Sequence, residues 1–353
     1  GYQNVAIGSF SLDANTGGVV NTAVGYVALG ANTSGDRNVA IGGFSLDANT
    51  TGNENTACGE GALSGNTTAS NNSAFGFQAL VVNSTGANNT ALGFKALQQN
   101  TTADGNTAVG QEALEQCTTG AGNTAVGSIA LDNLTTGSLN TCIGRNSLAT
   151  LTTGTENDAM GVSAMSETTT GSYNVAIGRN ALGNLTTANY NTAVGNHAGV
   201  NVSTGSSLVA IGGLALDANT TASENTAVGY QALSGVTTGG FNVAVGTAAL
   251  RNNVTGANNV AVGRDCLIAA TSGGNTGVGF HALNDLTSGD ACTAVGANAL
   301  ESVTTGVRNE GFGSSVMLSL TTGNDNVAIG RQAFPNLTTG SGNIGLGNIG
   351  IVS

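Results

Sequence analysis

The side chains that could carry out chemistry are few and dispersed along the chain. His197 and His281, the two histidines, are the natural candidates for proton transfer near neutral pH, but they lie far apart in the sequence. No serine stands in a Gly-x-Ser-x-Gly elbow between a strand and a helix, and the acidic residues occur singly rather than in pairs. No glycine-rich segment precedes a helical pattern that could hold a phosphate. We therefore expect no enzymatic activity, no cofactor and no bound metal.

Composition narrows the classes of partner. The net charge of −12, with only 8 lysines and arginines, disfavours nucleic acid, and no apolar run approaches the ~20 residues of a membrane-inserted helix. Five cysteines share no spacing, so we interpret them as small apolar side chains rather than a disulfide framework. They are Cys58, Cys117, Cys142, Cys266 and Cys292.

The whole chain is one short repeat. The pentapeptide Asn-Thr-Ala-Val-Gly at residues 21–25 returns at residues 225–229, and close variants recur every 17 residues from Asn4 onward. One unit, residues 259–274, has 16 residues, and there are 21 units in all. A fixed short period predicts a stack of identical coils, so we expect an all-β parallel solenoid (a β-roll) forming a single continuous domain over residues 1–353.

Numbering each unit from its first asparagine gives 17 repeat positions, and two of them are nearly invariant. Position 5 is glycine in every unit, which predicts a positive φ or a close backbone approach. Position 1 is almost always asparagine, which predicts a ladder of stacked amides, although asparagine is also simply a good turn former. Examples are Gly8, Gly25, Gly42 and Gly229 at position 5, and Asn21, Asn38 and Asn225 at position 1.

The remaining positions suggest a core, two strands and two rims. Apolar residues at positions 4 and 9 predict burial, with strands at positions 1–4 and 7–10 and a Thr-Thr-Gly turn at positions 13–15. Position 12 is asparagine in the first six units and mostly aliphatic later, which indicates an enclosed corner where stacked asparagines can form a hydrogen-bonded ladder and leucines can stack instead. All charged residues except Asp158 and Glu310 fall at positions 6, 7, 10, 11, 16 and 17, the predicted solvated rims. The core residues include Val24, Ile41 and Val228 at position 4, and Leu29 and Leu233 at position 9.

Small residues at positions 3 and 8 predict a tight contact with a second surface. We expect that surface to belong to another copy of the chain, so the protein should be a homo-oligomer. The degenerate apolar end, Gly347–Ser353, could be a joint between subunits or a cleavage scar.

The Asn-Val-Ala-Ile-Gly segments at residues 4–8, 38–42, 174–178 and 326–330 resemble the head repeats of YadA-like trimeric autotransporter adhesins. The longer pattern from Asn225 to Leu233, followed by Thr237-Thr238-Gly239, is similar to repeats of bacterial and phage tail-fibre-like proteins. The resemblance implies a left-handed β-roll, three chains in one trimer, and an extracellular or virion location. The 17-residue period is longer than the usual adhesin head repeat, so handedness and trimer state come from the resemblance alone.

Three functions remain open at this point. The first is a structural and adhesive fibre segment, an adhesin head or a tail-fibre shaft, which attaches to a host-surface protein or glycan. The second is a self-polymerising extracellular filament whose chains stack end to end. The third is binding of a lattice such as ice or a crystalline polysaccharide through columns of threonine at positions 13 and 14.

Overall fold

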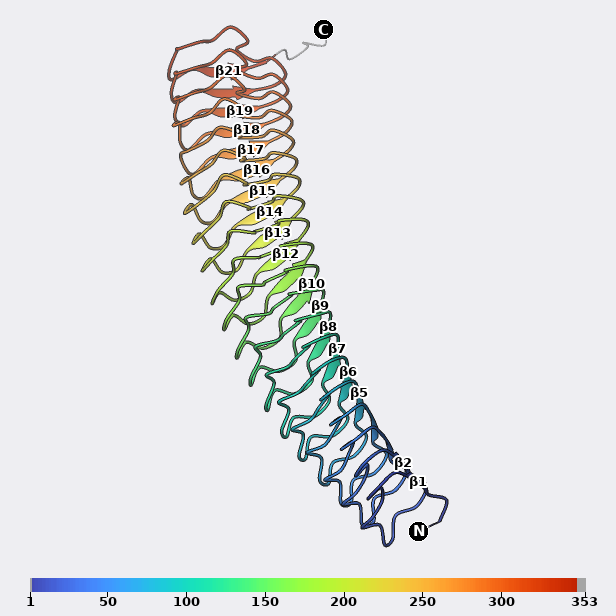
Figure 1. Ribbon diagram of the computed structural model, residues 1–353. Coiled ribbons are helices and arrows are strands. Elements are labelled where there is room, and N and C mark those ends of the chain that lie inside the picture. Colours follow the sequence, from blue (N-terminus) through green and yellow to red (C-terminus); the bar gives the residue numbers. More distant parts are fainter. Residues whose placement is uncertain (1, 348–353) are drawn as a thin grey trace. The chain divides into compact units, whose positions relative to one another are not determined.

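The structure is a computed structural model that describes residues 2–347. It divides into two compact units, Gly1–Asn174 and Val175–Ser353. Every repeat contributes one three-residue strand, at positions 2–4, and within each unit consecutive strands pair in parallel (Figure 1). The parallel β-solenoid is thus confirmed, with 21 strands and no helix in the described residues. The prediction of a single continuous domain stays a prediction.

The first unit contains ten strands that pair in chain order. Their register is the repeat itself, so Val5 pairs with Thr22 and Ala6 with Ala23. The strands are β1 (Val5–Ile7), β2 (Thr22–Val24), β3 (Val39–Ile41), β4 (Thr56–Cys58), β5 (Ser73–Phe75), β6 (Thr90–Leu92), β7 (Thr107–Val109), β8 (Thr124–Val126), β9 (Thr141–Ile143) and β10 (Asp158–Met160).

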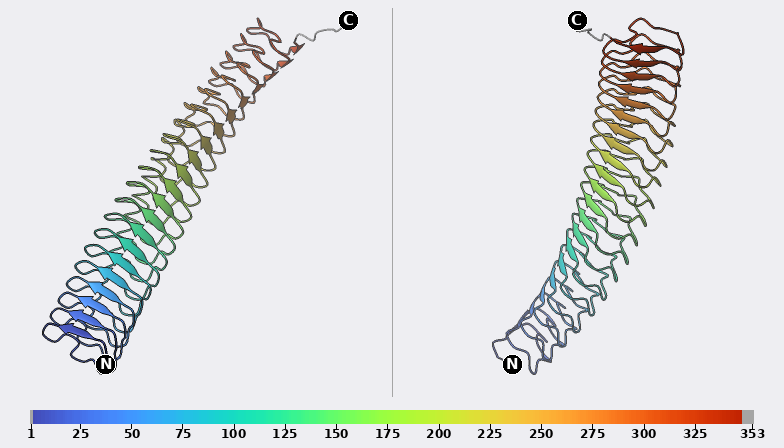
Figure 2. Two further views of the ribbon diagram at one scale, coloured as in Figure 1. Left: turned by 90° about the vertical axis from the view of Figure 1, so that its right-hand side faces the viewer. Right: turned by 180° about the vertical axis from the view of Figure 1, so that it is seen from behind.

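The second unit repeats this arrangement with eleven strands. All arrows within the unit point the same way in both further views (Figure 2). The strands are β11 (Val175–Ile177), β12 (Thr192–Val194), β13 (Val209–Ile211), β14 (Thr226–Val228), β15 (Val243–Val245), β16 (Val260–Val262), β17 (Thr276–Val278), β18 (Thr293–Val295), β19 (Glu310–Phe312), β20 (Val327–Ile329) and β21 (Ile344–Leu346).

The predicted second strand at positions 7–10 is wrong, because this segment is a turn. Val27 at position 7 and Leu29 at position 9 have φ of 59° and 51°, and the same two positions are left-handed in nearly every coil. Two left-handed residues bend the chain and end any strand, at a cost of about 1–2 kcal/mol each. Coil-to-coil bonding continues nonetheless, since Leu29 N–H donates to the Ser45 carbonyl at 3.1 Å and Val27 N–H to the Ser9 carbonyl at 2.9 Å.

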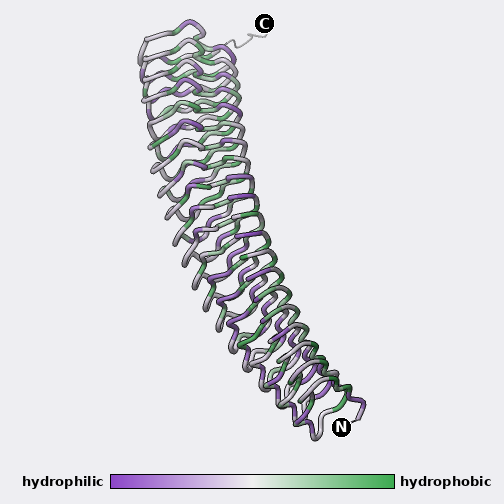
Figure 3. The backbone as a smooth tube through the Cα atoms, viewed as in Figure 1, coloured by the Kyte–Doolittle hydropathy of each residue, from purple (hydrophilic) through white to green (hydrophobic). Residues whose placement is uncertain are grey.

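The core lies inside each coil and is built from positions 1, 3, 8, 9 and 12. Ala23, Ala28 and Leu29 are completely buried, as is Leu233 in the second unit, which confirms the prediction for position 9. The alanines at positions 3 and 8 therefore face the chain's own interior, and the prediction that they contact a second chain is wrong. The strand and the left-handed turn approach so closely that only a small side chain fits between them. Figure 3 shows how hydrophobic segments recur from coil to coil.

Three coils show this tight fit directly, because each has glycine instead of alanine at position 3. A Cβ on Gly277 would meet Cys266 Sγ at 2.5 Å, and one on Gly311 would meet Val316 Cγ1 at 2.9 Å. A Cβ on Gly345 would likewise collide with the ring of Phe334. Each of these glycines faces a side chain larger than the usual alanine at position 8 or leucine at position 9. The interior volume per coil is therefore nearly constant.

The predicted burial of position 4 is also wrong. Ile41 is 43% exposed, and Val24 and Val228 are only half-buried. Successive side chains of a strand point to opposite faces, so with position 3 directed inward, positions 2 and 4 must point outward. The segment after Gly347, proposed as a joint or a scar and containing Ile351 at position 9, lies outside the described residues.

Candidate interaction surface

The outward position-4 side chains form a column of apolar residues along the strands of each unit, which we call the apolar column. Such exposed apolar stripes are typical of interaction sites on soluble proteins. Those that are 36–66% exposed are Ile7, Ile41, Phe75, Leu92, Ile143 and Met160 in the first unit, and Ile177, Ile211, Val245, Val262, Val278, Val295, Phe312, Ile329 and Leu346 in the second.

The apolar column accepts no polar side chain in any of the 21 units. Its neighbours on the same face do, since position 2 holds Asp158 and Glu310 and position 6 holds Arg145 and Arg179. A position that faced water in the working protein would be expected to accept charge as these neighbours do. This contrast makes the apolar column a candidate contact surface.

Aromatic side chains on the neighbouring rim extend this surface in the first unit. Tyr26 packs edge-on against Phe10 and Phe44, with ring centroids 6.0 and 5.3 Å apart. Phe77 and Phe94 stack with centroids 5.7 Å apart. Exposed aromatic residues are enriched in protein interfaces, so the rim and the column together form one candidate contact surface.

The asparagines at position 1 form the predicted ladder. Asn38 N–H donates to Asn21 Oδ1 at 2.8 Å, and Asn38 Nδ2 donates to the carbonyl of Gly52 at 2.8 Å. Asn225 takes part in the same way, accepting from Asn242 N–H at 2.9 Å. These side chains are completely buried, and each one ties its coil to the next and closes its own turn. Their role is structural.

A second ladder at position 12 runs through the first six coils. Its members from Asn32 to Asn100 are completely buried, and each of their Nδ2 groups donates to Oδ1 of the preceding asparagine, as between Asn66 and Asn49 at 2.9 Å. The ladder ends at Asn100, whose buried Oδ1 has no partner because the next coil has Cys117 at this position. It comprises Asn15, Asn32, Asn49, Asn66, Asn83 and Asn100.

The position-5 glycines have both features that the sequence predicted, a positive φ and a close approach of another backbone segment. Gly8, Gly25, Gly42 and Gly229 have φ between 129° and 141°, a region closed to other residues. A Cβ on Gly229 would lie 2.5 Å from the carbonyl oxygen of Gly246 in the next coil. Any side chain here would force the coils apart.

Threonine columns occupy the loop side of the coil. Most position-13 hydroxyls are half-buried and donate to the next coil, as from Thr118 to the carbonyl of Thr135 at 3.1 Å. Position-14 threonines, in contrast, are exposed in every coil from Thr51 to Thr255. The position-14 column is therefore the more consistently exposed of the two, although Thr16, Thr271 and Thr287 at position 13 are also exposed.

The two histidines lie on the rim at position 7 of different coils. His281 places Nδ1 3.2 Å from Glu301 Oε1 and Nε2 3.6 Å from Asp265 Oδ2. The sequence analysis missed this cluster, because positions 7 and 10 of successive coils become neighbours only once the coils stack. The described residues contain no group of three His, Cys, Asp or Glu side chains able to hold a metal ion.

Burial perturbs several titratable groups. It raises the pKa of Asp132 to about 6, helped by the nearby charges of Glu115 and Glu112. It also raises the pKa of the thiols of Cys117, to about 11, and Cys142, to about 12. Four of the five cysteines are buried and all five are free, as expected for apolar substitutes.

Within residues 2–347, no helix is long and apolar enough to cross a membrane. No protein-family model matches the chain, and no curated protein matches it.

Proposed function

We propose that the chain is a segment of an extracellular adhesive fibre, at a cell surface or on a virion. In this proposal three copies of a left-handed solenoid pack through their apolar columns. One observation carries it: position 4 is apolar in all 21 units, yet its side chains remain exposed or half-buried in the single chain. The resemblance of the Asn-Val-Ala-Ile-Gly segments to adhesin head repeats supports the trimer and the left hand.

The repeat makes coil-by-coil contact between copies physically reasonable. Parallel strands rise by about 4.8 Å per coil, so columns on neighbouring chains share the same spacing and can interdigitate along their length. Burying the column contributes roughly 25 cal/mol per Å² of apolar surface, summed over many coils. The fibre then needs no catalytic residue, because its role is to project and to attach.

Light scattering of the purified chain tests the assembly. We expect a discrete mass three times the 34.3 kDa of one chain. A variant with Ile211→Asp, Val245→Asp and Val262→Asp in the apolar column should be monomeric while keeping its β circular dichroism. A constant mass of one chain at all concentrations, or a charged column that still forms trimers, would refute the proposal.

A matched control places the same charges on the loop side. The triple variant Thr221→Asp, Thr238→Asp and Thr255→Asp should keep the native mass, because these exposed position-14 side chains lie outside the proposed contact. Mass that grows without limit as concentration rises would instead favour the end-to-end filament. Attachment is tested separately, by retention of chain-coated beads on host-cell surfaces compared with uncoated beads.

The exposed position-14 threonines support a second candidate, binding of a lattice such as ice or a crystalline polysaccharide. Their hydroxyls repeat once per coil, which gives one regular row on the loop side. A thermal-hysteresis assay of the native chain tests the ice version, and the position-14 triple variant should abolish any effect. Absence of thermal hysteresis in the native chain would exclude ice binding.

A further inference from the structure

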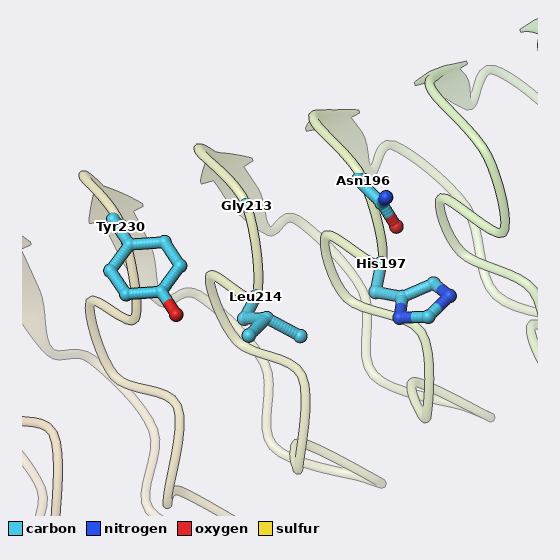
Figure 4. Close-up of a pocket in the computed structure, with 5 residues that line it drawn as sticks. All are labelled: Asn196, His197, Gly213, Leu214 and Tyr230. Carbon is cyan, nitrogen blue, oxygen red and sulfur yellow. The ribbon is translucent and has the colours of Figure 1, made fainter.

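A hollow of about 240 Å³ opens on the rim of the second unit (Figure 4). Its lining is Asn196, His197, Gly213, Leu214 and Tyr230, which come from three consecutive coils. The hollow exists because Gly213 lacks a side chain at position 6, where the coils on either side have Asn196 and Tyr230. Figure 4 shows Tyr230, Leu214 and His197 in a row across these coils.

One side of the hollow is apolar. The side chain of Tyr230 is 53% exposed, and Leu214 lies beside it on the preceding coil. An aromatic ring offers a flat apolar surface with a polar hydroxyl at its end, a combination that suits ligands that are themselves amphipathic.

The other side carries hydrogen-bonding groups, and one of them, His197, interacts electrostatically with Asp217. The exposed amide of Asn196 can both donate and accept. His197 Nε2 lies 3.1 Å from Asn180 Nδ2. Because an amide nitrogen can only donate, this bond uses the lone pair of Nε2 and leaves Nδ1–H of the neutral ring as a donor for a ligand.

We propose that this hollow binds one ring of a neutral saccharide. Its volume is below the roughly 300–1,000 Å³ of sites for drug-sized ligands, so it suits a single ring. A pyranose presents a face of C–H groups, which can lie on Tyr230, and an edge of hydroxyls, which can bond the amide and imidazole. The net charge of −12 disfavours an acidic saccharide.

This inference assigns a ligand class to the proposed attachment function and rests on it, but its test does not depend on assembly. Saturation-transfer NMR with the purified chain would screen the methyl glycosides of glucose, galactose, mannose and N-acetylglucosamine. We expect saturation of ring C–H protons for at least one of them. Signals from none would overturn the saccharide assignment, and so would binding of N-acetyl-phenylalanine amide in their place. The mass measured by light scattering would still decide the fibre proposal separately.

A variant with a side chain that fills the hollow tests the proposed site most directly. A Cβ on Gly213 would lie 3.6 Å from Tyr230 Cδ2, an ordinary contact, and another coil already has Gln111 at this position. Gly213→Gln should therefore fold normally and weaken binding at least about tenfold, as should Tyr230→Ala through loss of the ring contact. The matched control is Gly43→Gln, also at position 6, where a Cβ would meet nothing within 4 Å. Unchanged binding by Gly213→Gln, or equal loss in the control, would contradict the assigned site.

Discussion

Cutting the position-12 ladder at Asn66 should destabilise the protein more than shortening it at its end. In Asn66→Leu, the Oδ1 of Asn49 loses the donor that approaches to 2.9 Å, while the bond from Asn83 to Asn66 Oδ1, at 3.0 Å, is also lost. Leucine itself fits, since Leu134 and Leu151 are completely buried at the same position. The new defect is therefore a buried acceptor without a partner, which costs about 1–3 kcal/mol.

The matched control is Asn100→Leu at the last rung. It removes the bond to Asn83 at 2.7 Å, but it also removes the buried Asn100 Oδ1 that already lacks a partner. The number of buried oxygens without a donor is thus unchanged, while leucine adds the same apolar burial in both variants. The difference between the two isolates the orphaned oxygen of Asn49.

Urea denaturation followed by circular dichroism measures both variants at one protein concentration. Asn66→Leu should unfold at a lower urea concentration than Asn100→Leu, with a free-energy difference of about 1–3 kcal/mol. Equal midpoints, or a lower midpoint for Asn100→Leu, would refute the view that the amide ladder stabilises the stack through satisfied buried oxygens.

Three further predictions follow from the backbone, the core and the buried acid. Gly110→Ala should lower the free energy of unfolding, measured by urea denaturation, by at least about 3 kcal/mol, because φ is 141° and the Cβ would strike the next coil. Its control, Gly105→Ala, should lower it by about 1 kcal/mol or less, because φ is 70° and the Cβ would meet open space. Gly277→Ala should destabilise the protein, and adding Cys266→Ala should restore its stability, giving a coupling energy of about 1–3 kcal/mol in a double-mutant cycle. Additive effects of the two substitutions would contradict the proposed clash with Cys266 Sγ. Asp132 has a pKa of about 6 in the folded protein against its usual 3.8, so the folded protein binds this proton more tightly than the unfolded chain. The stability that Asp132 contributes is therefore fully present below pH 4 and is lost as the pH rises through 6. Asp132→Asn should accordingly raise the melting temperature at pH 7.5 but not at pH 4, and an equal effect at both pH values would exclude this cause.

Much of the fold could be predicted from the repeat alone. The period, the parallel stack, the obligatory position-5 glycines and the amide ladders all follow from residues that recur because each coil repeats its neighbour. The buried leucines of position 9 were predicted for the same reason. The left-handed turn at positions 7–9 was not, because leucine and valine there are typical of strands, and coil-to-coil bonds such as that from Leu29 stabilise the strained turn.

The candidate surface was harder to predict than the fold. The side chains of the apolar column, at position 4, were predicted to be core. Position 4 is adjacent to the alanine of position 3, and the sequence does not show which of the two side chains points into the coil. The hollow beside Tyr230 arises from one glycine at a variable position, and its lining residues come from three coils whose alignment the sequence does not display. The pairing of His281 with Glu301 depends on the same stacking.

The sequence by itself determined the repeat, its strand and the residues that each coil must have in common. Only the tertiary structure decided which face of that strand is inside. The physical reason is the narrow interior of the coil: the left-handed turn lies so close to the strand that alanine fits at position 3 and the larger position-4 side chain must point outward. That choice converts a predicted core into an exposed apolar column, on which the proposed assembly depends.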